Sequence, residues 1–97
     1  MTTGLAEENR ELVAERFAVN LAHCKRERGM SLTEISERAE IHRTHLGLLL
    51  RGKRLVRIDT VVKLAGALGV PLSALLEGVR WHPPQGPGSP GRFELTN

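Results

Sequence analysis

The stretch SLTEISERAEIHRTHLGLLLRGKR, from Ser31 to Arg54, constrains the fold of this chain more than any other part. Ser31 and Glu34 have the spacing of a capping box, in which each side chain binds a free backbone N–H at the start of a helix. The pattern predicts two short helices separated by a tight turn, the second over residues 43–51. Their inward-facing residues are predicted to be Leu32, Ile35, Ala39, Leu46, Leu49 and Leu50. Helices this short bury too little surface to be stable alone, so they must pack on the rest of the chain.

Charge is unevenly distributed along the chain. Between Ile41 and Ile58 there is no Asp or Glu, and the cationic residues are Arg43, Arg51, Lys53, Arg54 and Arg57. The N-terminus is acidic instead, with Glu7, Glu8, Glu11 and Glu15. Phosphate-backbone binding needs locally concentrated cations, so this distribution favours nucleic-acid binding over a merely solvated surface, although the net charge is only +3.

The segments RERGMSLTEIS, AEIHRTHL, LLRGKR and IDTVVKLAGALGVPLSALL together resemble the phage-repressor-type (Cro/repressor, or xenobiotic-response-element) helix-turn-helix family over residues 17–76. The resemblance implies a compact five-helix bundle of the lambda-repressor-like type, which places its third helix in the DNA major groove, usually as a dimer. Glu40 departs from the family because glycine is usual in this turn, and a left-handed backbone there would cost a non-glycine residue roughly 1 kcal/mol.

The expected fold class is therefore all-α, a five-helix bundle with an extended C-terminal tail. The expected division is an acidic extension over residues 1–14, the DNA-binding domain over 15–78 and a Pro/Gly-rich tail over 79–97. The first helix is predicted over residues 7–27, after a loose start, and the fourth over 58–68. Core positions predicted in the last two helices are Ile58, Val61, Val62, Ala65, Leu68, Leu72, Leu75 and Leu76. The extension either lengthens the first helix as a dimer contact or is simply solvated.

The tail differs in composition from the bundle. Residues 83–91, PPQGPGSPG, hold four of the five prolines and predict a semi-rigid linker without regular structure. Residues 92–96 alternate polar and apolar side chains, as a short strand does. Trp81 and Phe93 flank the linker and suggest docking onto a surface of this chain or of a partner, with a frayed tail as the alternative.

The resemblance implies that the start of the third helix contacts DNA bases through His42, Arg43, Thr44 and Leu48. The Arg43 guanidinium suits guanine O6 and N7, and Thr44 suits a base edge or a thymine methyl group. Leu48 makes an apolar contact with a thymine methyl group in one interpretation and belongs to the core in the other. Phosphate contacts are expected from Arg51, Lys53, Arg54 and Arg57, and by resemblance from Ser31 and the Leu32 amide.

Other site chemistries are not indicated. His42 and His45 are three residues apart, but two ligands alone make a poor metal site, and neither metal nor cofactor is expected. The single cysteine, Cys24, excludes an internal disulfide and fits a buried structural thiol better than a reactive one. No GxSxG, phosphate-loop or HExxH motif is present, so an enzyme is not expected.

The predicted function is sequence-specific binding of double-stranded DNA by a homodimeric transcriptional regulator, a repressor, at an inverted-repeat operator. The alternative is a protein-interaction module of the same fold, such as an antitoxin-type regulator that binds a partner protein through the third helix or the tail. The acidic N-terminus is unlike a signal peptide and no run is long enough to span a membrane. The expected location is cytoplasmic and nucleoid-associated.

Overall fold

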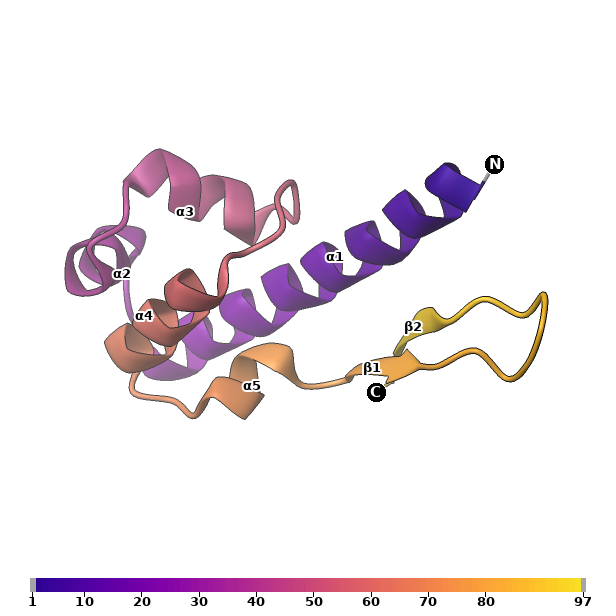
Figure 1. Ribbon diagram of the computed structural model, residues 1–97. Helices are drawn as coiled ribbons and strands as arrows, with labels where there is room; N and C mark the ends of the chain where they lie inside the picture. The colour runs from indigo at the N-terminus through magenta and orange to yellow at the C-terminus, as the bar shows by residue number, and fades with distance from the viewer. Residues whose placement is uncertain (1, 97) are drawn as a thin grey trace.

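The computed structural model describes residues 2–96, with side chains described from Asn9 onward. Within this range five helices precede a two-stranded antiparallel hairpin. Their bounds are α1 Thr2–Arg28, α2 Leu32–Ala39, α3 Arg43–Leu50, α4 Ile58–Leu68, α5 Leu72–Leu76, β1 Val79–His82 and β2 Arg92–Leu95. In Figure 1, α1 runs through the molecule as a long rod, with α2 and α3 on one side and the hairpin on the other. The expected five helices are confirmed, but "all-α" is slightly wrong because of the hairpin.

One aliphatic core unites all five helices. Its largest fully buried side chains are Phe17, Leu21, Ile35, Leu46, Leu49, Leu64, Leu68 and Leu75. The inward positions of α4 also include Val61 and Ala65, as predicted. Ile58 is 84% exposed and Val62 52% exposed, so their assignment to the core is wrong. Their places on α4 fall outside the buried stripe that runs through residues 61, 64, 65 and 68.

The start of α2 and the turn between α2 and α3 both have the predicted local chemistry. The Ser31 hydroxyl accepts the Glu34 N–H at 3.1 Å, and the Glu34 carboxylate accepts the Ser31 N–H at 3.0 Å. Glu40 ends α2 in the left-handed conformation, with φ 54° and ψ 47°. The Ile41 N–H then donates to the Ser36 carbonyl at 3.1 Å, which closes the turn. The strain expected for a non-glycine residue at position 40 is therefore present.

Side chains from neighbouring helices satisfy the free carbonyls at the ends of α4 and α5. Asn20 donates to the Leu75 and Glu77 carbonyls at 3.0 and 2.9 Å. Arg38 donates to the Ala67 carbonyl at 2.9 Å, and Arg28 donates to the Gly69 carbonyl. Because the last carbonyls of a helix have no intrahelical donor, these bonds fix how α1 and α2 lie against the end of the bundle.

The C-terminal segment, residues 79–96, forms a hairpin that lies against α1. Its strands pair Val79 with Leu95 and Trp81 with Phe93, whose rings stand edge to face at 4.9 Å. The strand predicted over residues 92–96 is confirmed, whereas β1 was not predicted. Residues 83–91 connect the strands with a single isolated bridge, between Gly86 and Ser89. Residues 79–96 thus form a hairpin against α1 and not a frayed tail, but Trp81, one of the two aromatic residues expected to dock, is 54% exposed.

Strand β2 and the residue that follows it are hydrogen-bonded to α1. The Phe93 N–H donates to the Asn9 side-chain oxygen at 3.3 Å, and the Arg16 guanidinium donates to the Thr96 carbonyl. The backbone of α1 is helical from Thr2, so the loose start expected before residue 7 is wrong. The hairpin and the N-terminal half of α1 therefore form one packed unit beside the bundle.

Candidate nucleic-acid interface

The start of α3 presents three consecutive exposed polar side chains, those of His42, Arg43 and Thr44. His42 is the N-cap, and its ring Nδ1 accepts the Thr44 N–H at 3.1 Å. The Arg43 guanidinium donates to the Thr33 hydroxyl of α2 at 3.4 Å, an exposed contact that uses one of its five donors. The first turn of α3 therefore offers an orientable guanidinium, a hydroxyl and an imidazole edge to solvent.

The leucines of α3 divide into two groups. Leu46 and Leu49 are fully buried, which anchors one side of the helix in the core. Leu50 is half-buried and also packs on the core. Leu48 is half-buried but is not one of the hydrophobic residues that pack there. Its position is compatible with the predicted contact with a thymine methyl group, which stays a prediction.

The four predicted basic phosphate ligands are all exposed, and they lie in the segment from the end of α3 to the start of α4. These residues are Arg51, Lys53, Arg54 and Arg57. Arg57 forms an ion pair with Asp59, with 3.2 Å between Nε and Oδ1, but both side chains are mostly in solvent. Exposed pairs of this kind contribute little, so the Arg57 cation stays available to a phosphate.

Ser31 and Leu32 lie at the start of α2. The Ser31 hydroxyl is engaged in the capping box, and Ser31 itself is exposed. The Leu32 amide belongs to the first turn, where backbone N–H groups have no intrahelical acceptor. The half-buried Leu32 side chain packs on the core, so a phosphate would be met by its backbone only.

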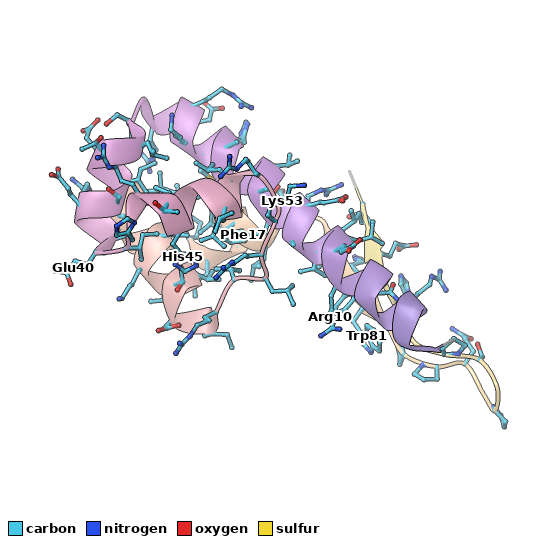
Figure 2. The ribbon with its side chains drawn as sticks, turned by 90° about the horizontal axis from the view of Figure 1, so that it is seen from above. Arg10, Phe17, Glu40, His45, Lys53 and Trp81 are labelled. Atoms are coloured by element: carbon cyan, nitrogen blue, oxygen red, sulfur yellow. The ribbon has the colours of Figure 1, made fainter. Side chains whose placement is uncertain are left out.

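Figure 2 looks down on this side of the molecule, with His45 on α3 and Lys53 where the following loop meets α1. His45 is half-buried and His42 is exposed. Among the described residues, no group of three His, Cys, Asp or Glu side chains is arranged to hold a metal ion. Cys24 is buried, and its burial raises the pKa of the thiol above 9.0, as suits a structural residue.

Two residues beside this surface were not singled out from the sequence. Thr33 receives the Arg43 hydrogen bond, and Arg10 of α1 lines a pocket with the basic loop. Arg10 lies in the segment interpreted as an acidic extension, so its partner in the fold could not be read from local sequence. The sequence offered only a weak indication of this position: Arg10 lies one helical turn before Ala14, which belongs to the buried stripe of α1.

A model of the helix-turn-helix family, HTH_3, matches residues 21–75, more than half of the chain. The chain therefore belongs to this family of DNA-binding transcription regulators of the xenobiotic-response-element type. A search of curated proteins finds no match.

Solved structures of regulators share the fold. The restriction-modification controller protein C.AhdI from Aeromonas hydrophila is 26% identical, with a TM-score of 0.62 over 64% of this chain and 94% of that one. An HTH_3 family transcriptional regulator from Vibrio cholerae is 26% identical, with a TM-score of 0.66 over 68% of this chain and 37% of its own. The clp gene regulator ClgR from C. glutamicum, at 23% identity, matches 66% of this chain and 83% of its own, with a TM-score of 0.63.

None of the helices within residues 2–96 combines the length and apolar character that crossing a bilayer requires.

Proposed function

We propose that this chain is a transcriptional repressor that binds an inverted-repeat operator as a homodimer, with α3 in the major groove. The observation that carries the proposal is the exposed start of α3, where Arg43 and Thr44 stand on a helix anchored by buried Leu46 and Leu49. The helix must be held rigidly, because direct readout requires its hydrogen-bond donors to meet the edges of the DNA bases with fixed geometry. Restriction-modification controller proteins and other regulators of the same fold support the assignment to gene control.

Base contacts are assigned to His42, Arg43, Thr44 and Leu48. Arg43 is the principal specificity residue because a bidentate contact with guanine discriminates against the other bases by about 1–3 kcal/mol. Phosphate contacts are assigned to Arg51, Lys53, Arg54 and Arg57, with the backbone at Ser31 and Leu32. These contacts hold the protein in register on the duplex without reading its sequence.

A homodimer is supported by two exposed leucines on α5. Leu72 is 46% exposed and Leu76 43% exposed, so the prediction that both close the core is wrong. Leu75 alone of the three is fully buried. An apolar strip on the last helix of the bundle is the kind of surface that a second copy would cover. Two recognition helices related by a two-fold axis would then meet half-sites about 34 Å apart.

The test is selection of random double-stranded DNA by the purified protein, followed by affinity measurements at several salt concentrations. Enrichment of an inverted repeat is expected. A dimer using about eight phosphate contacts would lose about 10³–10⁵ in affinity between about 50 and 200 mM salt. Retention of DNA without enrichment would contradict sequence-specific readout, and no retention at low salt would contradict the proposal as a whole.

Arg43 and Arg54 provide a matched pair of variants for the same assay. Arg43→Ala is expected to relax preference at one base position by about 1–3 kcal/mol, since it removes direct readout. Arg54→Ala is expected to weaken binding to all sequences about equally and to reduce the salt slope by about 1. An unchanged base preference in Arg43→Ala would show that α3 is not placed as proposed.

A further inference from the structure

The basic loop after α3 rests directly on α1. Gly52 adopts φ +69°, and a Cβ atom there would lie 3.3 Å from the Glu15 Cα and 3.6 Å from the Ala18 Cβ. Ala14, on the same side of α1, is 5% exposed. This close approach fixes the backbone of the loop at Gly52 relative to α1, while the side chains of Lys53, Arg54 and Leu55 are exposed.

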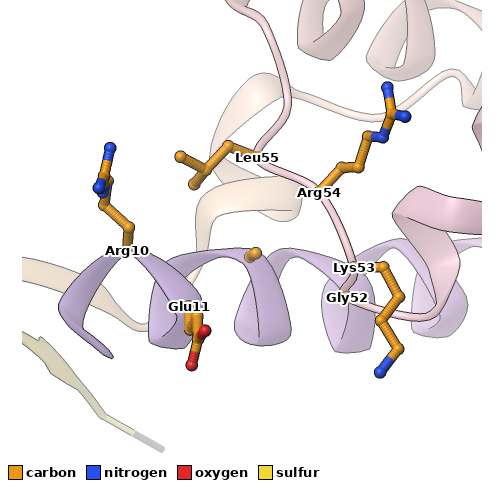
Figure 3. A pocket seen from close by; sticks show the side chains of 7 residues that line it. Arg10, Glu11, Gly52, Lys53, Arg54 and Leu55 are labelled. Carbon is orange, nitrogen blue, oxygen red and sulfur yellow. The ribbon is translucent and has the colours of Figure 1, made fainter. Parts of the chain in front are cut away.

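Arg10 lies one helical turn before Ala14, so both residues are on the same face of α1. Its side chain therefore emerges just beyond the edge of the loop. The structure has a pocket at this place, lined by Arg10, Glu11, Ala14, Gly52, Lys53, Arg54 and Leu55. Figure 3 shows Arg10, Leu55 and Arg54 pointing to the same side of α1, whereas Glu11 and Lys53 point to the opposite side.

The two guanidinium groups on that side form no ion pair with any side chain of residues 9–96. Two like charges facing one region of solvent repel each other weakly and lower the free energy of an anion placed there. Arg54 is already assigned to a phosphate, and Arg10 extends the same cationic surface toward the N-terminus of α1.

The hairpin holds this part of α1 in place. Its bonds to α1 are made by Asn9 and Arg16, which flank Arg10 on either side along the helix. Both lie outside residues 21–75, the part matched by the family model, as does the hairpin itself. The two added segments therefore contact each other at positions on either side of Arg10, whose side chain points to the same side of α1 as that of Arg54.

We propose that Arg10 is a further DNA-binding residue, which contacts a backbone phosphate on the same side of α1 as the one held by Arg54. The inference rests on the proposed function and extends the footprint of each protomer beyond the helix-turn-helix module. The ligand is a phosphodiester of duplex DNA, since a continuous row of phosphates matches cations that point to one side of α1 with Leu55 between them.

The test compares Arg10→Gln, Arg10→Lys and Arg80→Gln in the full chain with the selected operator. Arg80 is an exposed residue of β1, and Figure 1 places the hairpin across α1 from α3, so Arg80→Gln is a control with the same charge change. Arg10→Gln is expected to weaken binding about three- to tenfold at about 100 mM salt, with a salt slope shallower by about 0.9 for each phosphate that is no longer neutralised. Arg10→Lys is expected to retain most of the affinity, and Arg80→Gln is expected to change neither quantity.

The base preference should be the same in all three variants, because a phosphate contact does not read sequence. Circular dichroism checks that each variant keeps its helices. Equal behaviour of Arg10→Gln and Arg80→Gln, with steep salt-dependent binding by the unaltered protein, would overturn the Arg10 inference alone. Absence of DNA binding by the unaltered protein would overturn both this inference and the proposed function.

Discussion

The five-helix bundle and the hairpin are held together by different forces. Among residues 9–96, the eight largest fully buried side chains close the bundle, and seven of them are aliphatic. The hairpin is hydrogen-bonded to the side chains of Asn9 and Arg16 on α1, and in its aromatic pair Phe93 is half-buried while Trp81 is 54% exposed. Apolar burial contributes roughly 25 cal/mol per Å², whereas a partly exposed hydrogen bond contributes about 1 kcal/mol. The bundle can therefore stay folded when the hairpin has detached.

This difference provides two independent signals. Helical circular dichroism reports mainly on the bundle, whereas Trp81, the only tryptophan, reports on the hairpin. If the two regions unfold separately, urea will change Trp81 fluorescence before it changes the helical signal. Coincident transitions would instead mean that the chain unfolds as one cooperative unit.

The largest expected effect is in the bundle. Leu46→Ala removes a fully buried side chain of α3 and should lower the free energy of unfolding by about 2–5 kcal/mol, measured by urea denaturation with circular dichroism. Trp81→Ala in the hairpin should cost at most about 1.5 kcal/mol by the same measurement, since it mainly removes the edge-to-face contact with Phe93. Leu46→Met, which conserves volume, should cost less than about 1.5 kcal/mol. Equal losses for Leu46→Ala and Trp81→Ala would contradict the contrast between the two regions.

A smaller effect is expected at the junction between the two regions. Gly78 has φ +84°, and a Cβ atom there would overlap the Arg16 guanidinium and the Thr96 carbonyl. Gly78→Ala should therefore weaken docking of the hairpin by about 1–3 kcal/mol, seen as a shift of the Trp81 transition to lower urea. Gly88→Ala is the control, because Gly88 also has positive φ, +80°, but nothing lies within 4 Å of its Cβ position. Identical shifts would show that backbone strain, and not the contact with Arg16, determines the result.

The helix-turn-helix could be predicted from sequence because its signals are local. The capping box at Ser31 and Glu34, the left-handed turn at Glu40 and the His42 N-cap each depend on residues within one helical turn. The hairpin was predicted only in part. Alternation showed in residues 92–96, whereas β1 gave no comparable signal and its pairing partner lies beyond the loop of residues 83–91.

In α4 and α5, the buried side chains were harder to predict than the positions of the helices. Ile58, Val62, Leu72 and Leu76 fit an apolar helical pattern but are exposed, because the bundle has only one inward stripe per helix. The cationic pocket at Arg10 depends on where the loop crosses α1, a tertiary contact without a sequence pattern. The residues assigned to DNA contact remain predictions.

In the strained turn at Glu40, a substitution is expected to raise the free energy of unfolding moderately, whereas the preceding substitutions lower stability. Glu40→Gly removes the left-handed strain of a side-chain-bearing residue, roughly 1 kcal/mol, but adds chain entropy to the unfolded state. A net gain of about 0.5 kcal/mol in the free energy of unfolding is expected, measured by urea denaturation. Glu40→Gln keeps the strain and removes the charge. A gain of the same size in Glu40→Gln would attribute the effect to electrostatics.

The smallest effect concerns pH and the hairpin alone. His82 Nε2 lies 2.7 Å from Glu94 Oε1, and this hydrogen bond, together with the nearby charges of His82 and Arg92, lowers the pKa of Glu94 below 4.5. A carboxyl group with a depressed pKa stabilises the folded form above its ordinary pKa, and that contribution disappears as pH falls through the depressed value. Hairpin pairing should therefore weaken as pH falls below the ordinary titration range of a glutamate carboxyl group, which Trp81 fluorescence would show while the helical signal stays constant. Glu94→Gln should abolish this step, because an amide does not titrate. If the fluorescence change persists in Glu94→Gln, the Glu94 carboxyl group is not its cause. If fluorescence and helical circular dichroism change at the same pH, acid acts on the bundle and the hairpin has no separate response.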